Sequence, residues 1–357
     1  GATFSDPGRD ITVERVDGEL LRKRGVARVV SDPVGDRASV SVVGVGDAEN
    51  DHSFLSICGC AAAVNNAIAS IKSSADLCLT HDHGQGVCEL VDMLLEKDAA
   101  LVCVERIGVQ LGQSTHGRKL WLPAESVMLV VGNSGAGKSS YITWLTERMV
   151  QAHQGFCIID PEGDYLTLED AVTIGGLTAP PTTEESVHYL LQAQLNVVVN
   201  ALALDPVARV QLFGELLPFI QNLRSASGRP YWLIVDEAHY MLPHCAGWPP
   251  GFLGDIGAII VALDFDQVCP ALLEGVDVLV TLGSTARELV EQFAKRMQRP
   301  SPGFPERSPG LENACLWNVH EGDEVFLLDQ VQPHQKHHRH SGKYVAGDVG
   351  AWRSFHF

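Results

Sequence analysis

The sequence predicts an α/β protein whose larger part is a mainly parallel sheet with helices on both faces. Two observations lead to this prediction. Short apolar runs alternate with helical segments through the middle of the chain, a pattern typical of parallel sheets. A glycine-rich loop joins one of these runs to a helix, and acidic residues follow others at their carboxyl ends, where such sheets bind ligands. A second, partial α/β unit is expected at the N-terminus, over residues 1–97.

Composition narrows the class of protein. The chain has 357 residues, of which 45% are hydrophobic, enough for two globular domains. No apolar run approaches the length of a membrane span, so we expect no membrane partner. The nine cysteines include no C-x-x-C pair, which favours reduced, buried thiols in a cytoplasmic protein.

Charge and the chain start add two expectations. The 44 acidic and 26 basic residues give a net charge of −18, which argues against a surface broadly shaped for nucleic acid. A local basic channel for nucleic acid stays compatible with that charge. The chain begins at Gly1 without a signal sequence, and we expect that the natural start is missing.

A phosphate-binding loop follows the apolar run Val127 to Val131. The eight residues from Gly132 fit the Walker A pattern G-x-x-x-x-G-K-[ST] in full. Glycines let successive N–H groups wrap an oxyanion, and the following helix adds a partial positive charge. The alternative is a glycine-rich turn with a chance lysine. The residues expected to contact ATP are Gly132, Asn133, Ser134, Gly135, Ala136, Gly137, Lys138, Ser139 and Ser140.

Within this loop two side chains have chemical roles. We expect Lys138 to reach the outer phosphates and the Ser139 hydroxyl to complete a Mg²⁺ shell. The segment after it carries Ile142, Leu145 and Met149 at helical spacing, which predicts a helix that packs on the sheet.

A second motif ends another apolar run, Tyr231 to Val235. Asp236 suits the Walker B position that holds Mg²⁺, and Glu237 is placed to orient and polarise the attacking water. Glu237 and Lys138 are therefore the catalytic candidates. His239 either senses the γ-phosphate or caps a turn.

Further segments complete the expected sheet. The strand 156–160 runs into an acidic loop, 161–165, and a β-branched run lies within 193–203. A helix is expected over 206–223, with a kink at Pro218. Two more buried strands, 257–264 and 276–283, carry Asp264 and Thr281 near their ends, in sensor, core or capping roles.

The helix expected over 286–297 is amphipathic and carries Arg287, Lys295 and Arg296. These cations either form a solvated face or supply an arginine to the nucleotide of a neighbouring subunit. Before the sheet, residues 98–125 read as a hairpin or linker, with strands at 101–107 and 119–123 and a turn at 112–117. We place the ATPase domain at 126–329 and a basic tail at 330–357.

Together these motifs resemble the HerA/FtsK-type branch of P-loop ATPases over about residues 105–330. The matching strings are G-N-S-G-A-G-K-S, I-I-D-P-E-G-D-Y and I-V-D-E-A-H, of which the second is the most specific. The resemblance implies a RecA/HerA-like fold and an ATP-driven motor or switch, commonly hexameric and often acting on DNA.

The N-terminal region offers a strand over 38–46 that ends in an acidic loop with Asp47, Asn50 and Asp51. Carboxylates at a strand's carboxyl end suit Mg²⁺ beside a phosphate. The alternative is a turn in which Asp51 caps a helix that starts near Ser53.

The longer string G-D-A-E-N-D-H-S-F-L and its continuation resemble the last third of a Cof-like phosphatase of the haloacid dehalogenase superfamily. By this resemblance Asp47 and Asp51 hold Mg²⁺. The family's nucleophile motif, D-x-D-G-T, has no counterpart, because the surroundings of Asp6 and Asp32 lack its spacing. We therefore expect a fragment or a degenerate domain, joined to the ATPase as in a known bacterial fusion.

The leading prediction is Mg²⁺-dependent ATP hydrolysis by a homo-oligomer, a hexamer by resemblance. One alternative is a sugar-phosphate phosphatase that a P-loop domain regulates. Another is a nucleotide-binding scaffold without hydrolysis, although Glu237 speaks against it.

Overall fold

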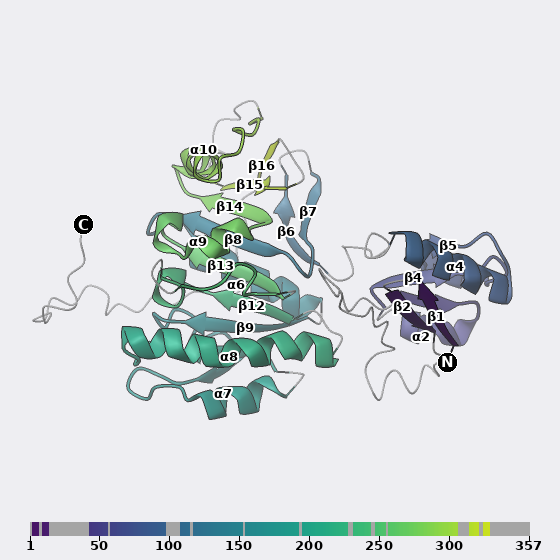
Figure 1. Ribbon diagram of the computed structural model, residues 1–357, viewed down its shortest axis with the longest axis horizontal. Helices are drawn as coiled ribbons and strands as arrows, with labels where there is room; N and C mark the ends of the chain where they lie inside the picture. The colour runs from purple at the N-terminus through teal and green to yellow at the C-terminus, as the bar shows by residue number, and fades with distance from the viewer. Residues whose placement is uncertain are drawn as a thin grey trace, which may run out of the picture.

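The computed structural model describes residues 2–6, 9–13, 43–55, 58–97, 108–114, 117–152, 154–192, 195–227, 231–243, 247–254, 256–305, 314–320 and 324–328. They form a nine-stranded sheet and a three-stranded sheet, each with its own helices, and two small hairpins (Figure 1). The predicted α/β class is confirmed. The strand expected at 101–107 and the tail at 330–357 lie outside the described residues.

The large sheet has the strand order β10-β11-β9-β12-β13-β8-β14-β15-β16. All neighbours from β10 to β14 run parallel, and β15 and β16 add an antiparallel edge. Its strands are β8 Val127–Gly132, β9 Gly155–Asp160, β10 Val172–Ile174, β11 Val197–Asn200, β12 Tyr231–Val235, β13 Gly257–Ala262, β14 Val278–Leu282, β15 Ala314–Asn318 and β16 Val325–Leu327.

The central strands are apolar along their whole length because both faces of the sheet are covered. Every residue of β8 is buried, and the same holds for β12, β13 and β14. Leu129 and Val131 face one core, whereas Met128 and Val130 face the other. This double burial explains why the strands read as continuous apolar runs rather than as alternating patterns.

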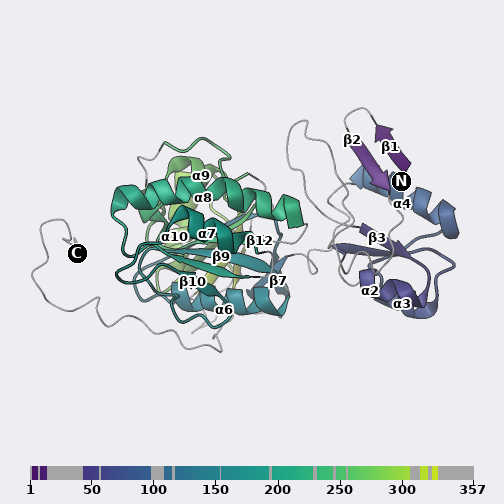
Figure 2. The same ribbon diagram turned by 90° about the horizontal axis from the view of Figure 1, so that it is seen from below.

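Helices cover both faces, as predicted. On one face lie α7 Thr183–Leu190, α8 Pro206–Ser227, α9 Pro270–Glu274 and α10 Ala286–Arg296. The other face packs against α6 Lys138–Gln151, in which Ile142, Leu145 and Met149 are buried. Figure 2 shows α8 and α9 on one side of the strands and α6 on the opposite side.

The hairpin before the sheet consists of β6 Val109–Gln113 and β7 Lys119–Leu122. The predicted turn at 112–117 is too long, because Gly112 and Gln113 belong to β6. A bulge between Gln110 and Gly112, whose φ is 138°, lets the strand continue into this stretch. The hairpin is anchored to α6, since the Tyr141 hydroxyl donates to the Leu111 carbonyl at 2.9 Å.

The helix predicted over 206–223 extends four residues further, to Ser227. It continues through Pro218, which is exposed, so the hydrogen bond that proline cannot make is lost on the solvent side. No helix in the described parts of the chain is both long enough and apolar enough to cross a membrane.

The small unit is a parallel sheet in the order β3-β4-β5, with β3 Val43–Gly46, β4 Cys60–Ala63 and β5 Leu77–Cys78. Its core consists mainly of alanines from β4, together with Leu55, Ile71 and Leu90. Its helical segments are η1 Glu49–Asp51, α2 His52–Leu55, α3 Ala69–Ser74 and α4 His83–Lys97. The hairpin of β1 Ala2–Asp6 and β2 Arg9–Val13 precedes it in the chain.

Candidate functional site

The glycine-rich loop leaves β8 at the carboxyl edge of the large sheet and leads into α6. A side chain at Gly132 would bring its Cβ to 2.7 Å from the Leu282 carbonyl oxygen, which is too close for any residue but glycine. Gly135 and Gly137 have φ values of 83° and 95°, in the left-handed region that glycine adopts at little cost. The loop therefore needs its glycines for backbone reasons, as a phosphate-binding loop does.

Lys138 is the first residue of α6 and points into the loop rather than into solvent. Its side chain is 7% exposed, and its Nζ donates to the Gly132 carbonyl at 2.7 Å and to the Asn133 carbonyl at 3.4 Å. The loop's own backbone thus holds a buried cation at the positive end of a helix. Such a concentration of positive charge favours an anion at this place.

Neighbouring segments support the loop from the side of β14. The Asn133 side chain donates to the Thr285 hydroxyl at 3.2 Å. Thr281 is fully buried, and its hydroxyl donates to the Ala286 carbonyl at 2.8 Å. Asp264 accepts from the Asp266 N–H at 2.9 Å. Thr281 therefore has a core role and Asp264 a capping role, two of the roles that the sequence left open for them.

The acidic loop after β9 is organised around Asp160, which is completely buried. Its carboxylate accepts hydrogen bonds from four successive backbone N–H groups, those of Glu162, Gly163, Asp164 and Tyr165. Burial raises the pKa of Asp160 to about 6, against which these N–H groups act. Asp160 is thus an internal anchor for the loop, a role that the bare sequence did not predict.

The acidic loop meets the phosphate loop through Asp164. The Ser139 hydroxyl donates to Asp164 Oδ2 at 3.3 Å, and Asp164 is 9% exposed. Asp236, at the end of β12, is 2% exposed. Burial raises the pKa of Asp236 well above its usual range, and the nearby charges of Glu237, Asp160 and Asp164 add to the effect.

These side chains form an oxygen-rich site with too little positive charge to balance it. A hydroxyl and carboxylates are the donors that Mg²⁺ prefers, so the residues fit that ion. In the described parts of the chain, no three His, Cys, Asp or Glu side chains gather closely enough to hold a metal by themselves. A magnesium ion here would therefore need further oxygens, such as those of a bound phosphate.

Glu237 follows Asp236 with an unusual backbone. Its φ and ψ are 41° and 57°, the left-handed conformation, which costs a non-glycine residue about 1 kcal/mol or more. Its side chain is 12% exposed, and Oε2 lies 3.6 Å from Nδ1 of His239. Such strain is typical of functional sites, where the surrounding structure holds a side chain in a required place.

His239 lies among several charges of the site. Burial lowers its pKa, and the cations Lys138 and Arg209 act in the same direction, whereas Glu162 opposes them. His239 is therefore a neutral imidazole at neutral pH. Its surroundings are compatible with a role as a phosphate sensor, and its contact with Glu237 is equally compatible with a structural role.

Arg209 is the site residue that the sequence did not reveal. It lies in the first turn of α8, where the sequence predicted a helix but no site residue. The Arg209 guanidinium lies over the Tyr240 ring, 4.8 Å from its centroid, and close enough to Glu162 to interact with its charge. No motif marks this arginine, because the contact joins two elements that are distant in the sequence.

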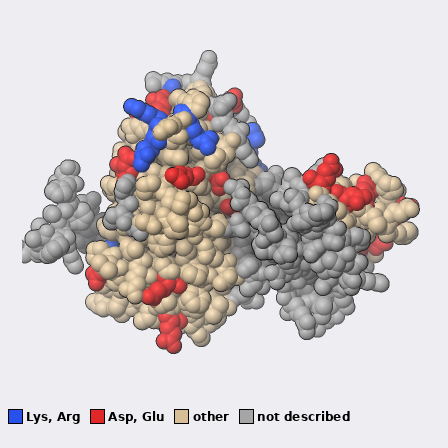
Figure 3. All heavy atoms as spheres, in the orientation of Figure 1, with Lys and Arg blue, Asp and Glu red and all other residues tan. Residues whose placement is uncertain are grey.

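The three predicted cations of α10 lie on the exposed side of that helix. Arg287 pairs with Glu291 at 3.4 Å and Arg296 with Asp266 at 3.2 Å, and Lys295 is exposed beside them. Figure 3 shows Lys and Arg side chains gathered around the α10 end of the molecule. This position fits the predicted solvated face, and it leaves these cations accessible to a neighbouring subunit.

In the small unit, the predicted acidic loop is closed by one of its own side chains. Asp51 Oδ2 accepts from the N–H groups of Asp47 and Ala48, at 2.8 and 3.0 Å. A Cβ at Gly46 would lie 2.7 Å from the Cβ of Asp51, so the loop requires glycine there. One oxygen of Asp51 thus has a structural role, but Asp51 acts from inside the short helix η1, Glu49–Asp51, and not as the cap of a helix that starts near Ser53. The metal role of Asp47 and Asp51 stays a prediction.

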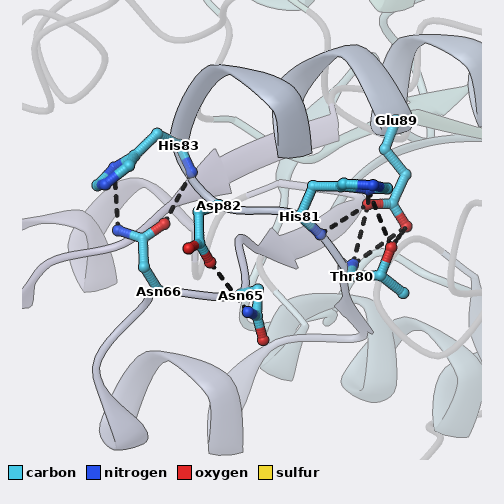
Figure 4. A network of polar contacts seen from close by, with 7 residues as sticks. All are labelled: Asn65, Asn66, Thr80, His81, Asp82, His83 and Glu89. Carbon is cyan, nitrogen blue, oxygen red and sulfur yellow. Dashed lines mark hydrogen bonds and ion pairs between the residues drawn. The ribbon is translucent and has the colours of Figure 1, made fainter.

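A polar network joins the start of α4 to two loops of the small unit (Figure 4). Glu89 accepts from the N–H and hydroxyl groups of Thr80 and from the N–H and ring of His81. Asn66 contacts His83 twice, through its oxygen at 2.7 Å and its nitrogen at 3.1 Å. The hydrogen bonds from His81 and Thr80 lower the pKa of Glu89 to about 2. The network therefore fixes the entry to α4.

Comparison with protein families agrees with both resemblances. Residues 124–227 match the family described as the central domain of the helicase HerA, and residues 36–91 match the haloacid dehalogenase-like hydrolase family. The predicted pairing of these two segments in one chain is confirmed. Comparison with curated proteins gave no match.

Comparison with solved structures found partial likenesses. The genome packaging NTPase B204 of Sulfolobus turreted icosahedral virus 2 is 14% identical, with a TM-score of 0.43 over 60% of this chain and 100% of its own. VirB4 of Thermoanaerobacter pseudethanolicus is 14% identical, with a TM-score of 0.41 over 63% of this chain and 97% of its own. The pCW3 conjugation coupling protein TcpA is 12% identical, with a TM-score of 0.37 over 65% and 68%.

Proposed function

We propose that this chain, which carries a segment of the HerA central-domain family at residues 124–227, binds ATP with Mg²⁺ and hydrolyses it. One observation above all supports the proposal. A buried lysine inside a glycine-rich loop lies on the same sheet edge as two acidic residues that end β12. Only β13 separates the two strands, as a site that binds phosphate and activates water requires.

Each side chain has a role in this proposal. Lys138 exchanges the carbonyls of its own loop for the outer phosphate oxygens of ATP. Residues 132–140 surround the phosphates with backbone N–H groups and the Ser139 and Ser140 hydroxyls. Ser139 and Asp236 would hold Mg²⁺, which when bound neutralises charge on the phosphate oxygens. Glu237 orients the attacking water and, as a general base, accepts a proton from it.

Two wider parts of the proposal rest on the family resemblance. We propose an ATPase domain over residues 126–329, preceded by a haloacid dehalogenase-like unit over 1–97. We also propose that hydrolysis drives a motor or switch in an assembly of several copies. Nucleic acid is a candidate substrate of such a motor, although the net charge of −18 restricts it to a local channel.

Nucleotide binding is tested first through Lys138→Ala. Removing the cation that meets the outer phosphates is expected to abolish measurable binding of Mg-ATP in calorimetry. Lys119→Ala, at an exposed position of β7, is the matched control and is expected to bind like the wild type. Thermal unfolding shows whether both variants are folded. Unchanged ATP affinity in folded Lys138→Ala protein would rule out the assignment.

A further inference from the structure

Arg209, in α8, contacts two segments that are distant from each other in the sequence, the residues after β11 and the residues after Glu237. Its Nε donates to the Ala201 carbonyl at 3.1 Å and its Nη2 to the Leu202 carbonyl at 3.2 Å. Its guanidinium carbon lies 4.8 Å from the centroid of the Tyr240 ring. The planar fork of arginine can bind two carbonyls and stack on an aromatic face together, which lysine cannot do.

The first segment, Ala201 and Leu202, is fixed to the acidic loop. The N–H of Ala201 donates to the Asp160 carbonyl at 2.8 Å, directly beside the carboxylate that organises residues 160–165. The N–H of Leu202 donates to Asn200 Oδ1 at 2.9 Å, and Asn200 is fully buried at the end of β11. The two carbonyls that hold Arg209 thus belong to the residues that directly follow β11, and hydrogen bonds tie these residues to the edge of the sheet.

The second segment that Arg209 contacts is the short helix η3, Ala238–Tyr240, which follows Glu237. The N–H of Tyr240 donates to the Glu237 carbonyl at 3.0 Å, and the N–H of Leu242 to the Ala238 carbonyl at 2.7 Å. Glu237 keeps its left-handed backbone only while this turn is held, because that conformation is disfavoured by itself. Because Arg209 of α8 lies over the Tyr240 ring, it can hold this turn in place.

We propose that Arg209 is a positioning residue that clamps the Glu237–Tyr240 turn to the sheet edge, and so holds the Glu237 carboxylate where hydrolysis needs it. The proposal rests on the proposed ATPase function. In this proposal Arg209 acts through the Tyr240 ring, because its bonds to two backbone carbonyls hold the guanidinium against that ring. Its half-buried position also lowers its pKa, as burial disfavours the charged form.

The test is a double-mutant cycle on ATP turnover. We expect Arg209→Met and Tyr240→Ala each to lower kcat by between about 10-fold and 100-fold, the scale of a misplaced catalytic group. The dissociation constant for Mg-ATP is expected to stay within about 2-fold, because neither side chain meets the nucleotide. The double variant is expected to be no slower than the slower single variant, since both changes break one contact.

Conservative and matched variants separate this role from a general loss of structure. Tyr240→Phe keeps the ring and is expected to retain wild-type kcat, whereas Arg209→Lys is expected to recover only part of it. Arg148→Met removes a similar contact, with Arg148 lying 5.1 Å from the Trp144 ring near the far end of α6. We expect this control to leave kcat unchanged.

Two outcomes overturn the proposal. A wild-type kcat in Arg209→Met would show that the clamp is unnecessary. If the two single variants lower kcat independently, so that their factors multiply in the double variant, and Arg209→Met also raises the dissociation constant for Mg-ATP, then Arg209 binds the nucleotide itself. If the wild type does not hydrolyse ATP, the proposed function fails, and amide hydrogen exchange still tests the clamp. Arg209→Met is then expected to speed exchange at Tyr240, Met241 and Leu242, and unchanged exchange there would refute it.

Discussion

At the scale of the residue, Glu237 combines backbone strain with a carboxylate next to a neutral histidine. Glu237→Gln keeps the shape of the side chain and removes the charge that polarises water. We expect this variant to bind Mg-ATP and to lose turnover by about 10²-fold or more, the scale of general-base catalysis. Steady-state hydrolysis and calorimetry on the same protein measure both effects.

Glu162 provides the matched control for this prediction. It lies in the acidic loop, and its charge acts on His239 and Arg209, so it is a second glutamate whose charge reaches the segment that follows Glu237. Glu162→Gln is expected to reduce turnover less than Glu237→Gln does. If instead Glu237→Gln hydrolyses ATP like the wild type and Glu162→Gln does not, Glu162 is the base.

Residues with a local signature could be predicted from the sequence, and those without one could not. The glycines of the phosphate loop and Asp236 with Glu237 belong to short motifs that follow apolar strands, so spacing alone identified them. Arg209 meets Tyr240 across two elements, and Asp160 binds N–H groups whose direction depends on the folded loop. Such contacts arise from tertiary structure, which a single sequence does not display.

At the scale of the element, the acidic loop carries a pH dependence through Asp160. Burial raises its pKa from 3.8 to about 6 in the folded protein. An acid whose pKa is higher in the folded state stabilises the fold at low pH, and this contribution is lost as the pH rises through about 4 to 6. A shift of about two units corresponds to about 3 kcal/mol in the free energy of unfolding.

The comparison of wild type with Asp160→Asn isolates this contribution, because the other titrating groups are common to both. We expect the free energy of unfolding of the wild type, relative to that variant, to fall by about 3 kcal/mol between pH of about 3.5 and 7. Denaturant unfolding of nucleotide-free protein at several pH values measures it. A difference that does not change with pH would contradict the role given to burial.

Secondary-structure elements could be predicted from the sequence where all or nearly all of their residues are buried. The strands β8, β9, β11, β12, β13 and β14 were predictable because a strand covered on both faces leaves an uninterrupted apolar run. Strand β10 is only partly buried, and the sequence pattern did not reveal it. The turn of the hairpin was predicted to start too early, because the bulge at Gly112 breaks the alternation of a half-buried strand. The length of α8 was underestimated, because the prediction ended with the apolar face at Leu223 and did not use Gly228 and Pro230, which follow the helix in the sequence.

At the scale of the whole molecule, the exposed cations of α10 suggest contact between copies. We expect a nucleotide-dependent oligomer, in which Arg287, Lys295 or Arg296 of one copy approaches the ATP of another. Light scattering at micromolar concentration, with and without a non-hydrolysable ATP analogue, measures the mass. A monomer under both conditions would count against this prediction.

For the small unit, in contrast to the large sheet, we expect no catalysis. The reaction of the haloacid dehalogenase family needs a carboxylate nucleophile in line with phosphorus, and Asp47 and Asp51 are at most metal ligands by resemblance. We expect no Mg²⁺-dependent hydrolysis of p-nitrophenyl phosphate or sugar phosphates by this chain. Turnover that disappears in Asp47→Asn would refute this and would point to Asp6 or Asp32 as the nucleophile.

The place of β8 in the sheet has a consequence for synthesis on the ribosome. β8 emerges before every other strand of the large sheet, yet its two partners, β13 and β14, end at Ala262 and Leu282. A nascent chain therefore presents an apolar strand with two open edges, a species that chaperones shield from aggregation. The segment that matches the HerA family, residues 124–227, contains neither partner. We therefore expect the proposed ATP binding to develop only after Leu282 has left the exit tunnel, because the phosphate loop leaves β8 and β8 then has both of its neighbours.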